Sequence, residues 1–324
     1  MVRPKEAGFK RLAALAMPDS EHMDLADSLR HARTRIARAG RVLLGREWAG
    51  RNITILPDDT FLVSYPRSGN AWVRFLIGNL VHPDNPVTFA NVESILPYVD
   101  IHADHVLLKA PRPRIMKSLE PFFPPYPKVI YVVRDPRDVA VSYHYILIKD
   151  RHLPDGFSMD EFLPLFLNGE TFGVKIGSWA DHVMSWVKMR QDTERFLLVR
   201  YEDLLEDTPR ELARLAEFLG VPPEPERIAN AVEMSSAPRM RKLEKTEWRL
   251  WATTRRSRPD RPFVRSAKSG DWRSTLQKQS VRAIESAWAD SMRLLGYPMV
   301  TDASGSSVSA VDRVSPPTPA GFHS

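Results

Sequence analysis

The segment at residues 60–80 constrains the fold most, because it predicts a strand, a tight turn and a helix in succession. Its sequence, TFLVSYPRSGNAWVRFLIGNL, places a buried strand at Phe61–Tyr65, a turn at Pro66–Gly69 and a helix that starts near Asn70. Such a turn presents free backbone N–H groups at the positive end of the helix dipole, which favours a phosphate or sulfate group. Arg67 adds a positive charge at the mouth of the turn. The alternative is an ordinary strand–turn–helix with a solvated arginine.

The turn differs from the loop that binds nucleoside triphosphates. That loop requires the pattern G-x-x-x-x-G-K-[ST], whereas here Arg67 precedes the glycine. The octapeptide YPRSGNAW at Tyr65–Trp72 instead resembles the phosphosulfate-binding loop of sulfotransferases that use 3′-phosphoadenosine 5′-phosphosulfate (PAPS). The resemblance implies that Trp72 stacks against adenine. It also implies cofactor contacts for Arg67, Ser68, Gly69, Asn70 and Ala71, although Ala71 replaces a hydroxyl residue that is common in the family.

A second strand–helix junction strengthens this resemblance. A strand at Val129–Val133 is followed at once by Arg134, with Asp135 at a helix N-cap position and Pro136 in the first turn. Arg134 therefore falls at the carboxyl end of a strand, the edge where ligands bind in open α/β sheets. Arg134 and Ser142 resemble the family's 3′-phosphate site, and the planar fork of arginine suits bidentate bonds to phosphate. The alternative is a surface ion pair between Arg134 and Asp135.

Two later segments extend the resemblance. Residues 195–220 predict another strand and helix, and Tyr201 matches the family's tyrosine on the adenine side of the cofactor. Residues 263–273, FVRSAKSGDWR, resemble the family's C-terminal loop, in which Arg265 falls on an arginine that binds the 3′-phosphate. Ser235 stands where relatives place a hydroxyl against adenine. These segments occur in the family's order, which makes a chance match of all four unlikely.

The acceptor side departs from the family pattern. The segment RIMKSLEPF at residues 114–122 resembles a Lys-Ser/Thr-His-x-Pro motif, in which Lys117 would be the catalytic lysine. Leu119 stands where the family has the histidine that takes the acceptor's proton. Glu120 is the adjacent candidate base, although in an extended strand it would point away from the face of Lys117. The remaining candidate bases precede this segment: Glu93, His102 and His105.

The resemblance implies a sulfotransferase that moves a sulfuryl group from PAPS to a hydroxyl or amine of a small-molecule or lipid acceptor. Catalysis would rest on Arg67, Lys117 and Glu120, mostly through positioning and electrostatic stabilisation. No metal is expected, since the chain has no cysteine and shows no His/Asp pattern with ligand spacing. Because of Leu119, the alternative is a catalytically impaired protein that binds PAPS or its product PAP. A kinase-like phosphoryl transferase is disfavoured by the absent triphosphate loop.

Composition and strand–helix alternation predict the fold class. A chain of 324 residues with 43% hydrophobic residues suits a single α/β domain, placed at residues 51–300. Its central sheet is expected to be mostly parallel and flanked by helices, with a P-loop-like strand–loop–helix for the phosphosulfate. The lack of cysteine fits the cytoplasm, and the N-terminus has too short an apolar run for a signal peptide. No motif predicts an oligomeric state.

The ends and one internal loop differ from this core. Residues 1–50 are expected to form a basic helical extension, with an amphipathic helix at residues 24–48 that either packs on the domain or contacts an anionic membrane surface. Residues 301–324 are expected to be disordered. The basic loop at residues 238–262 suits a mobile lid over an anionic cofactor. Net charge of +6 is explained by such a cofactor, and no nucleic-acid-binding motif is present.

Overall fold

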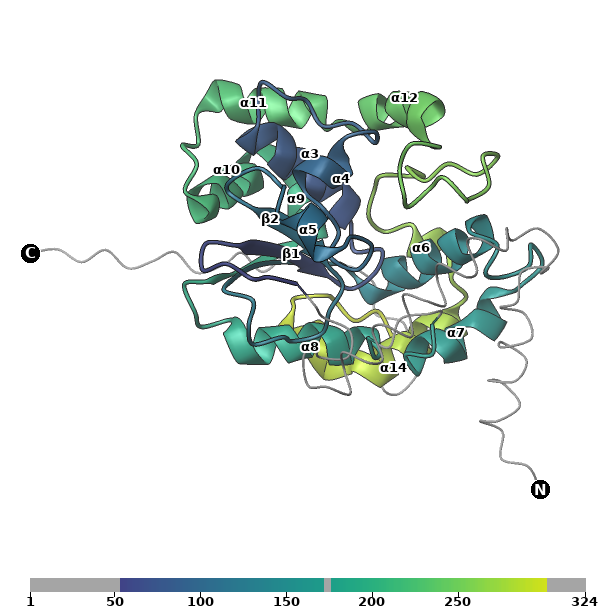
Figure 1. The fold of residues 1–324 in the computed structure, drawn as a ribbon. Coiled ribbons are helices and arrows are strands. Elements are labelled where there is room, and N and C mark those ends of the chain that lie inside the picture. The colour runs from purple at the N-terminus through teal and green to yellow at the C-terminus, as the bar shows by residue number, and fades with distance from the viewer. Residues whose placement is uncertain (1–52, 172–175, 302–324) are drawn as a thin grey trace, which may run out of the picture. The chain divides into compact units, whose positions relative to one another are not determined.

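The computed structural model describes residues 53–171 and 176–301, which form two compact units with a boundary between Leu276 and Gln277. The first unit contains a four-stranded parallel sheet in the order β2-β1-β3-β4 (Figure 1). The α/β prediction is therefore confirmed. The predicted helix at residues 24–48 and almost all of the predicted C-terminal tail lie outside the described residues. The strands are β1 (Thr60–Ser64), β2 (Ile115–Ser118), β3 (Lys128–Val133) and β4 (Phe196–Arg200).

The strand order creates a switch point between β1 and β3. From β1 the chain moves to β2 on one side, then returns to β3 and β4 on the other side. Val63 pairs in register with Ser118 on β2 and with Tyr131 on β3, so the carboxyl ends of these strands lie at one edge. Ligands of open α/β sheets bind outside such an edge where the strand order reverses. The loops after β1 and β3, which carry Arg67 and Arg134, meet there.

Helices cover both faces of the sheet, which explains why β1 and most of β3 are apolar and fully buried. In Figure 1, α3 (Asn70–Val81), α10 (Thr208–Leu219) and α11 (Pro225–Met234) lie on one face, and α8 (Trp179–Arg190) lies on the other. The remaining helices of this unit are α4 (Val92–Ile95), α5 (Asp104–Leu107), α6 (Pro136–Lys149), α7 (Met159–Leu167), α9 (Tyr201–Glu206), α12 (Ala237–Glu247) and α13 (Trp272–Thr275).

The prediction of a loop at residues 238–262 is wrong for the first half of this segment, because α12 occupies Ala237–Glu247. Ser236 has extended backbone angles at the N-cap, and a proline lies within the first turn, where its missing N–H does not interrupt the helix. The segment is rich in Arg, Lys, Glu, Met and Leu, which are strong helix formers. The high charge was mistaken for the signature of a loop. Trp251, farther along, is buried rather than mobile.

The second unit contains α14 (Lys278–Leu294), which is kinked at Trp288, where φ is −129°. The Glu285 carboxylate accepts hydrogen bonds from the backbone N–H groups of Val300 and Thr301, so the chain after the helix is fastened back to it. Among the helices of residues 53–171 and 176–301, none is long and apolar enough to cross a membrane.

Candidate functional site

The turn between β1 and α3 forms one wall of a pocket. Arg67 and Gly69 have positive φ angles of 69° and 99°. Glycine is required at position 69 for two reasons. Its positive φ is unfavourable for other residues, and a Cβ there would lie 2.4 Å from Cδ2 of the Tyr201 ring. No side chain caps the start of α3 at Gly69. The first N–H groups of α3 are thus available to an anion at the positive end of the helix.

Two polar atoms at this turn lack partners. The Ser68 hydroxyl and Nε of Arg134 are buried, and neither has a hydrogen-bond partner within the described chain. Buried polar groups in folded proteins are nearly always hydrogen-bonded. The guanidinium edge of Arg134, a residue that lines the pocket, fits a ligand that carries several oxygen acceptors.

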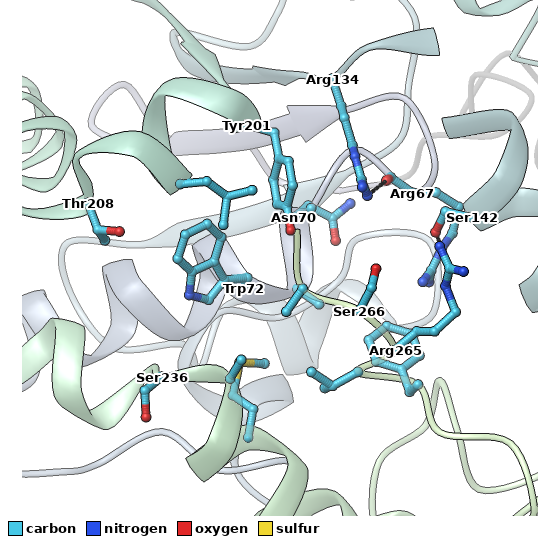
Figure 2. A pocket seen from close by; sticks show the side chains of 18 of the residues that line it. Arg67, Asn70, Trp72, Arg134, Ser142, Tyr201, Thr208, Ser236, Arg265 and Ser266 are labelled. Carbon is cyan, nitrogen blue, oxygen red and sulfur yellow. Dashed lines mark hydrogen bonds between the residues drawn. The ribbon is translucent and has the colours of Figure 1, made fainter. Parts of the chain in front are cut away.

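Three arginines from distant parts of the sequence converge on the pocket (Figure 2). Nε of Arg67 donates to Oγ of Ser142 at 3.1 Å, and Arg134 donates to the Arg67 carbonyl at 3.4 Å. Burial, together with the positive charges of Arg134 and Arg265, lowers the pKa of Arg67 to about 10, against the opposing effect of the Asp150 carboxylate. Like charges held this close favour an anionic ligand, because its charge offsets their repulsion.

Arg134 is held where β3 ends, and its interactions exclude the surface ion pair considered from the sequence. Its guanidinium lies 4.4 Å from the centre of the Tyr201 ring and donates to the Lys268 carbonyl at 3.0 Å. Asp135 caps α6 by accepting from the backbone N–H of Arg137 at 2.9 Å, as predicted, and forms its ion pair with the Arg137 side chain. Arg134 also lies 3.9 Å from the buried Asp138 carboxylate, and its unpaired Nε is a donor left over for a ligand.

Aromatic side chains line the other end of the pocket. The Trp72 and Tyr201 rings meet edge to face, with their centres 5.7 Å apart. Nε1 of Trp72 donates to the Ser235 carbonyl at 3.1 Å. The Ser235 hydroxyl is fully buried and accepts from Asn79, so it does not face the pocket. The neighbouring Ser236 lines the pocket in its place (Figure 2).

The cavity has a volume of about 280 Å³, near the lower end of the range for small-ligand sites. Its walls include most of the residues predicted to bind the cofactor: Arg67, Gly69, Asn70, Ala71, Trp72, Arg134, Ser142, Tyr201 and Arg265. The predicted residues that do not line it are Ser68, Lys117, Glu120 and Ser235.

Several pocket residues were missed in the sequence. Thr208 begins α10, and Met240 lies on the misassigned helix α12. Two other residues of α12 fix the loop that carries Arg265: Arg241 donates to the Arg265 carbonyl at 2.9 Å, and the Glu244 carboxylate accepts from the N–H groups of Phe263 and Val264. A helix at this position was signalled by Ser236 followed closely by a proline.

Lys117 lies near the end of β2, in a different environment. Its side chain is only 8% exposed, and Nζ lies 3.5 Å from the centre of the Tyr98 ring. Within residues 53–171 and 176–301, Nζ has no hydrogen-bond or ion-pair partner. Burial, together with the charges of Arg74 and Arg67, lowers the pKa of Lys117 to about 7, against the opposing effect of the carboxylates of Glu93 and Asp100. Lys117 is therefore a buried amine whose protonated form a nearby anion would stabilise.

The segment after Lys117 turns away from the strand. Since β2 ends at Ser118, the alternation that would point Glu120 away from Lys117 no longer applies. The Leu119 carbonyl accepts from Nε2 of His182 at 2.9 Å, and the Glu120 carbonyl accepts from Nε1 of Trp186 at 2.9 Å. These bonds to α8 fix the backbone of this turn.

The candidate bases that precede β2 are poorly suited to that role. Burial raises the pKa of Glu93, but Arg74, His102 and Trp251 hold it well below the usual range of a carboxyl group. The carboxylate accepts hydrogen bonds from these side chains. It is therefore a structural group that does not take up a proton near neutral pH. His102 is its partner, and His105 lies exposed on α5.

Parallel α/β architecture, with arginines and helix N–H groups converging at the switch point, is an arrangement suited to a polyanionic ligand. Comparisons with known proteins narrow this class. The family model "Sulfotransferase domain" matches residues 57–296. Mouse sulfotransferase 2B1 is 34% identical over 246 residues, which cover 72% of this chain and 71% of the relative. Rat sulfotransferase 1E1 is 30% identical, with coverage of 67% and 78%.

Solved structures agree with this assignment. The structure of mouse sulfotransferase SULT7A1 complexed with PAP matches with a TM-score of 0.61 and 26% identity, covering 74% of this chain and 86% of that one. A retinol dehydratase in complex with androsterone and PAP matches the fold with a TM-score of 0.64 and 22% identity, with coverage of 75% and 82%. The chain belongs to the sulfotransferase domain family. It is a PAPS-dependent sulfotransferase that acts on a small-molecule acceptor.

Proposed function

We propose that the pocket in Figure 2 is the PAPS site of this enzyme. The observation that carries this proposal is the convergence of Arg67, Arg134 and Arg265 beside the uncapped start of α3. PAPS carries two phosphate groups and a sulfate, so it needs several fixed cations and oriented N–H donors. The partnerless Nε of Arg134, a residue that lines the pocket, matches such a ligand.

The two ends of the pocket suit the two ends of PAPS. Arg67 and the N–H groups of the turn would hold the phosphosulfate. Arg134, Ser142 and Arg265 would hold the 3′-phosphate, while the rings of Trp72 and Tyr201 offer an apolar surface to adenine. Ser235 acts indirectly in this scheme, because its carbonyl fixes the indole of Trp72.

Lys117 would stabilise the charge that develops on the phosphate as the sulfuryl group leaves. When bound, PAPS supplies the activated sulfuryl group. The buried ammonium has no partner of its own in the described chain, so it can donate to a phosphate oxygen without breaking an existing bond. The negative charge of the bound nucleotide also raises the pKa of Lys117 and keeps it protonated. No metal has a role in this proposal.

The proposed acceptor is a hydroxyl group on a small molecule with an apolar body. Apolar side chains are exposed around α5, in the segment that precedes β2: Ile101, Val106 and Leu108. The retinol dehydratase structures contain androsterone or retinol, both hydroxylated apolar molecules. An amine or lipid acceptor, attachment to a membrane through residues 24–48 and a cytoplasmic location stay predictions from the sequence.

A panel assay tests the function directly. The protein is incubated with PAPS and hydroxylated phenols, sterols and retinoids, and sulfated products are identified by mass spectrometry alongside PAP release. We expect a sulfated product with at least one class and none when PAPS is replaced by ATP. PAP binding without any sulfated product would instead favour the impaired binder.

A further inference from the structure

Transfer of a sulfuryl group to a hydroxyl requires a group that takes the hydroxyl proton. Leu119 cannot accept a proton. Glu93 is a poor base, because three hydrogen-bonded partners stabilise its carboxylate. Lys117 carries a proton when it stabilises the leaving phosphate. A separate base is therefore needed on the acceptor side of Lys117.

Asp100 is brought to this position by an additional backbone pairing. The N–H of Lys117 donates to the Pro97 carbonyl at 2.8 Å, and the N–H of Val99 donates to the Lys117 carbonyl at 3.0 Å. These bonds extend the edge of the sheet by a parallel bridge between Tyr98 and Lys117. Asp100 follows directly, so its carboxylate lies beside the turn that follows β2.

The surroundings of Asp100 are those of a proton acceptor. Although Asp100 as a whole is exposed, partial desolvation of its carboxyl group raises the pKa above its ordinary value of 3.8, and the nearby Glu120 carboxylate raises it further. The polar Tyr98 hydroxyl and Leu119 N–H nearby oppose the rise, as does the Lys117 ammonium. Asp100 also keeps contact with solvent, which allows the proton to leave afterwards.

A continuous set of side chains links Asp100 to the nucleotide pocket. The Tyr98 ring carries the Lys117 ammonium on its face, and its hydroxyl interacts with the Asp100 carboxylate. Lys117 in turn lies close enough to Arg67 for the charge of Arg67 to lower its pKa. In space, Asp100 is thus followed by Lys117, which would stabilise the leaving phosphate, and then by Arg67, which would hold the phosphosulfate.

We propose that Asp100 is the general base of this sulfotransferase, oriented by Tyr98 and by the N–H of Leu119. An acceptor oxygen forms its bond to sulfur while its proton moves to the Asp100 carboxylate. The bond from sulfur to the phosphate oxygen breaks, and its electron pair stays on that oxygen, which Lys117 stabilises. Asp100 then gives the proton to water. This inference rests on the proposed PAPS site.

The Asp100→Asn variant tests the proposal, with Asp84→Asn as the matched control at an exposed position. We expect kcat for the best acceptor to fall by about 10²–10⁴-fold in Asp100→Asn, the usual contribution of a proton-transfer catalyst. PAP affinity measured by calorimetry and the unfolding midpoint should stay at wild-type values. Wild-type turnover in Asp100→Asn would overturn the proposal. Absence of PAP binding by the wild-type protein would overturn the PAPS site itself.

Three further measurements separate a base from a structural residue. Formate should restore part of the activity of Asp100→Ala, because a small carboxylate can enter the space left by the side chain. The acid limb of the kcat/KM profile should match the Asp100 pKa measured by carbon-13 NMR, and Asp100→Asn should lack that limb.

In Glu120→Gln, the limb should move to lower pH, since removal of a negative neighbour lowers the Asp100 pKa. Loss of the limb in Glu120→Gln with its retention in Asp100→Asn would assign the base to Glu120 and overturn the proposal.

Discussion

The nucleotide pocket and the transfer region around Lys117 solve different electrostatic problems. The pocket concentrates positive charge and braces it with many backbone contacts, as Arg134 shows by donating to two carbonyl groups. The transfer region holds one buried ammonium whose contact is an aromatic face, together with a carboxylate of raised pKa. In this chain, nucleotide binding and sulfuryl transfer therefore depend on different residues. Substitutions in the pocket should change the Kd for PAP, and substitutions in the transfer region should change kcat.

The largest expected effect comes from the transfer region. Lys117→Met has a similar length but removes the ammonium that lies over the Tyr98 ring, so it should lower kcat by about 10²–10³-fold, the usual effect of losing one group that stabilises transition-state charge. The Kd for PAP should change much less. Lys109→Met, at an exposed position, is the control. A large rise in the Kd with unchanged kcat would erase the distinction between the two regions.

The opposite pattern is expected in the pocket. Arg134→Lys keeps the charge but loses the planar fork, and it should raise the Kd for PAP by about 10–100-fold, the equivalent of one strong charge-assisted hydrogen bond. Calorimetry measures this change, and Arg195→Lys, exposed at the opposite end of β4, is the control. Unchanged affinity in Arg134→Lys would mean that the pocket acts through general charge attraction rather than through the planar guanidinium.

The pH profile sharpens the contrast. In the free enzyme the pKa of Lys117 is lowered to about 7, so the required ammonium is present below that pH and is lost above it. We therefore expect kcat/KM to fall by about tenfold per pH unit on the alkaline side, and the limb in kcat to lie higher, because bound nucleotide raises the pKa. An alkaline limb retained in Lys117→Met would show that another group titrates.

A smaller effect is expected at the brace between α12 and the Arg265 loop. Glu244→Gln weakens two hydrogen bonds to the N–H groups of Phe263 and Val264 by removing the charge of the acceptor. The Kd for PAP should rise by about 3–10-fold, since charge-assisted bonds are roughly twice as strong as neutral ones. Calorimetry measures the change against Glu233→Gln, an exposed control on α11. No change would mean that the loop keeps its position without this carboxylate.

The smallest effect concerns the aromatic end. Trp72→Phe keeps a ring but loses the hydrogen bond from Nε1 to the Ser235 carbonyl. The Kd for PAP should rise by about 2–5-fold, within the range for one neutral hydrogen bond. Competition binding measures it, and Trp248→Phe is the control. A loss as large as that of Arg134→Lys would place the decisive contact at the ring instead of the arginines.

The pocket was largely predictable from the sequence because its groups lie at strand–helix junctions. Arg67 and Arg134 follow their strands directly, and parallel strands bring such positions to one edge. Ser235 was placed in the pocket wrongly, since its carbonyl rather than its hydroxyl supports the site. Local sequence does not specify which atom of a residue a distant side chain contacts.

The transfer region was less predictable. Asp100 was not singled out, because its position depends on the pairing of Tyr98 with Lys117 across a gap in the sequence. Glu93 was considered as a base, but its role is fixed by contacts with Arg74 and Trp251, which come from separate elements. Such non-local contacts leave no periodic or motif signal in the chain.

The central claim is that the arginine-lined pocket binds a nucleotide with a 3′-phosphate, and calorimetric titration of the full chain with PAP and with ADP tests it most directly. Both nucleotides carry two phosphate groups, but PAP has one on the 5′ oxygen and one on the 3′ oxygen, whereas ADP has both in a chain on the 5′ oxygen. The account predicts micromolar or tighter binding of PAP, with ADP bound far more weakly. Equal affinity for PAP and ADP, or no binding of PAP by folded protein, would contradict it.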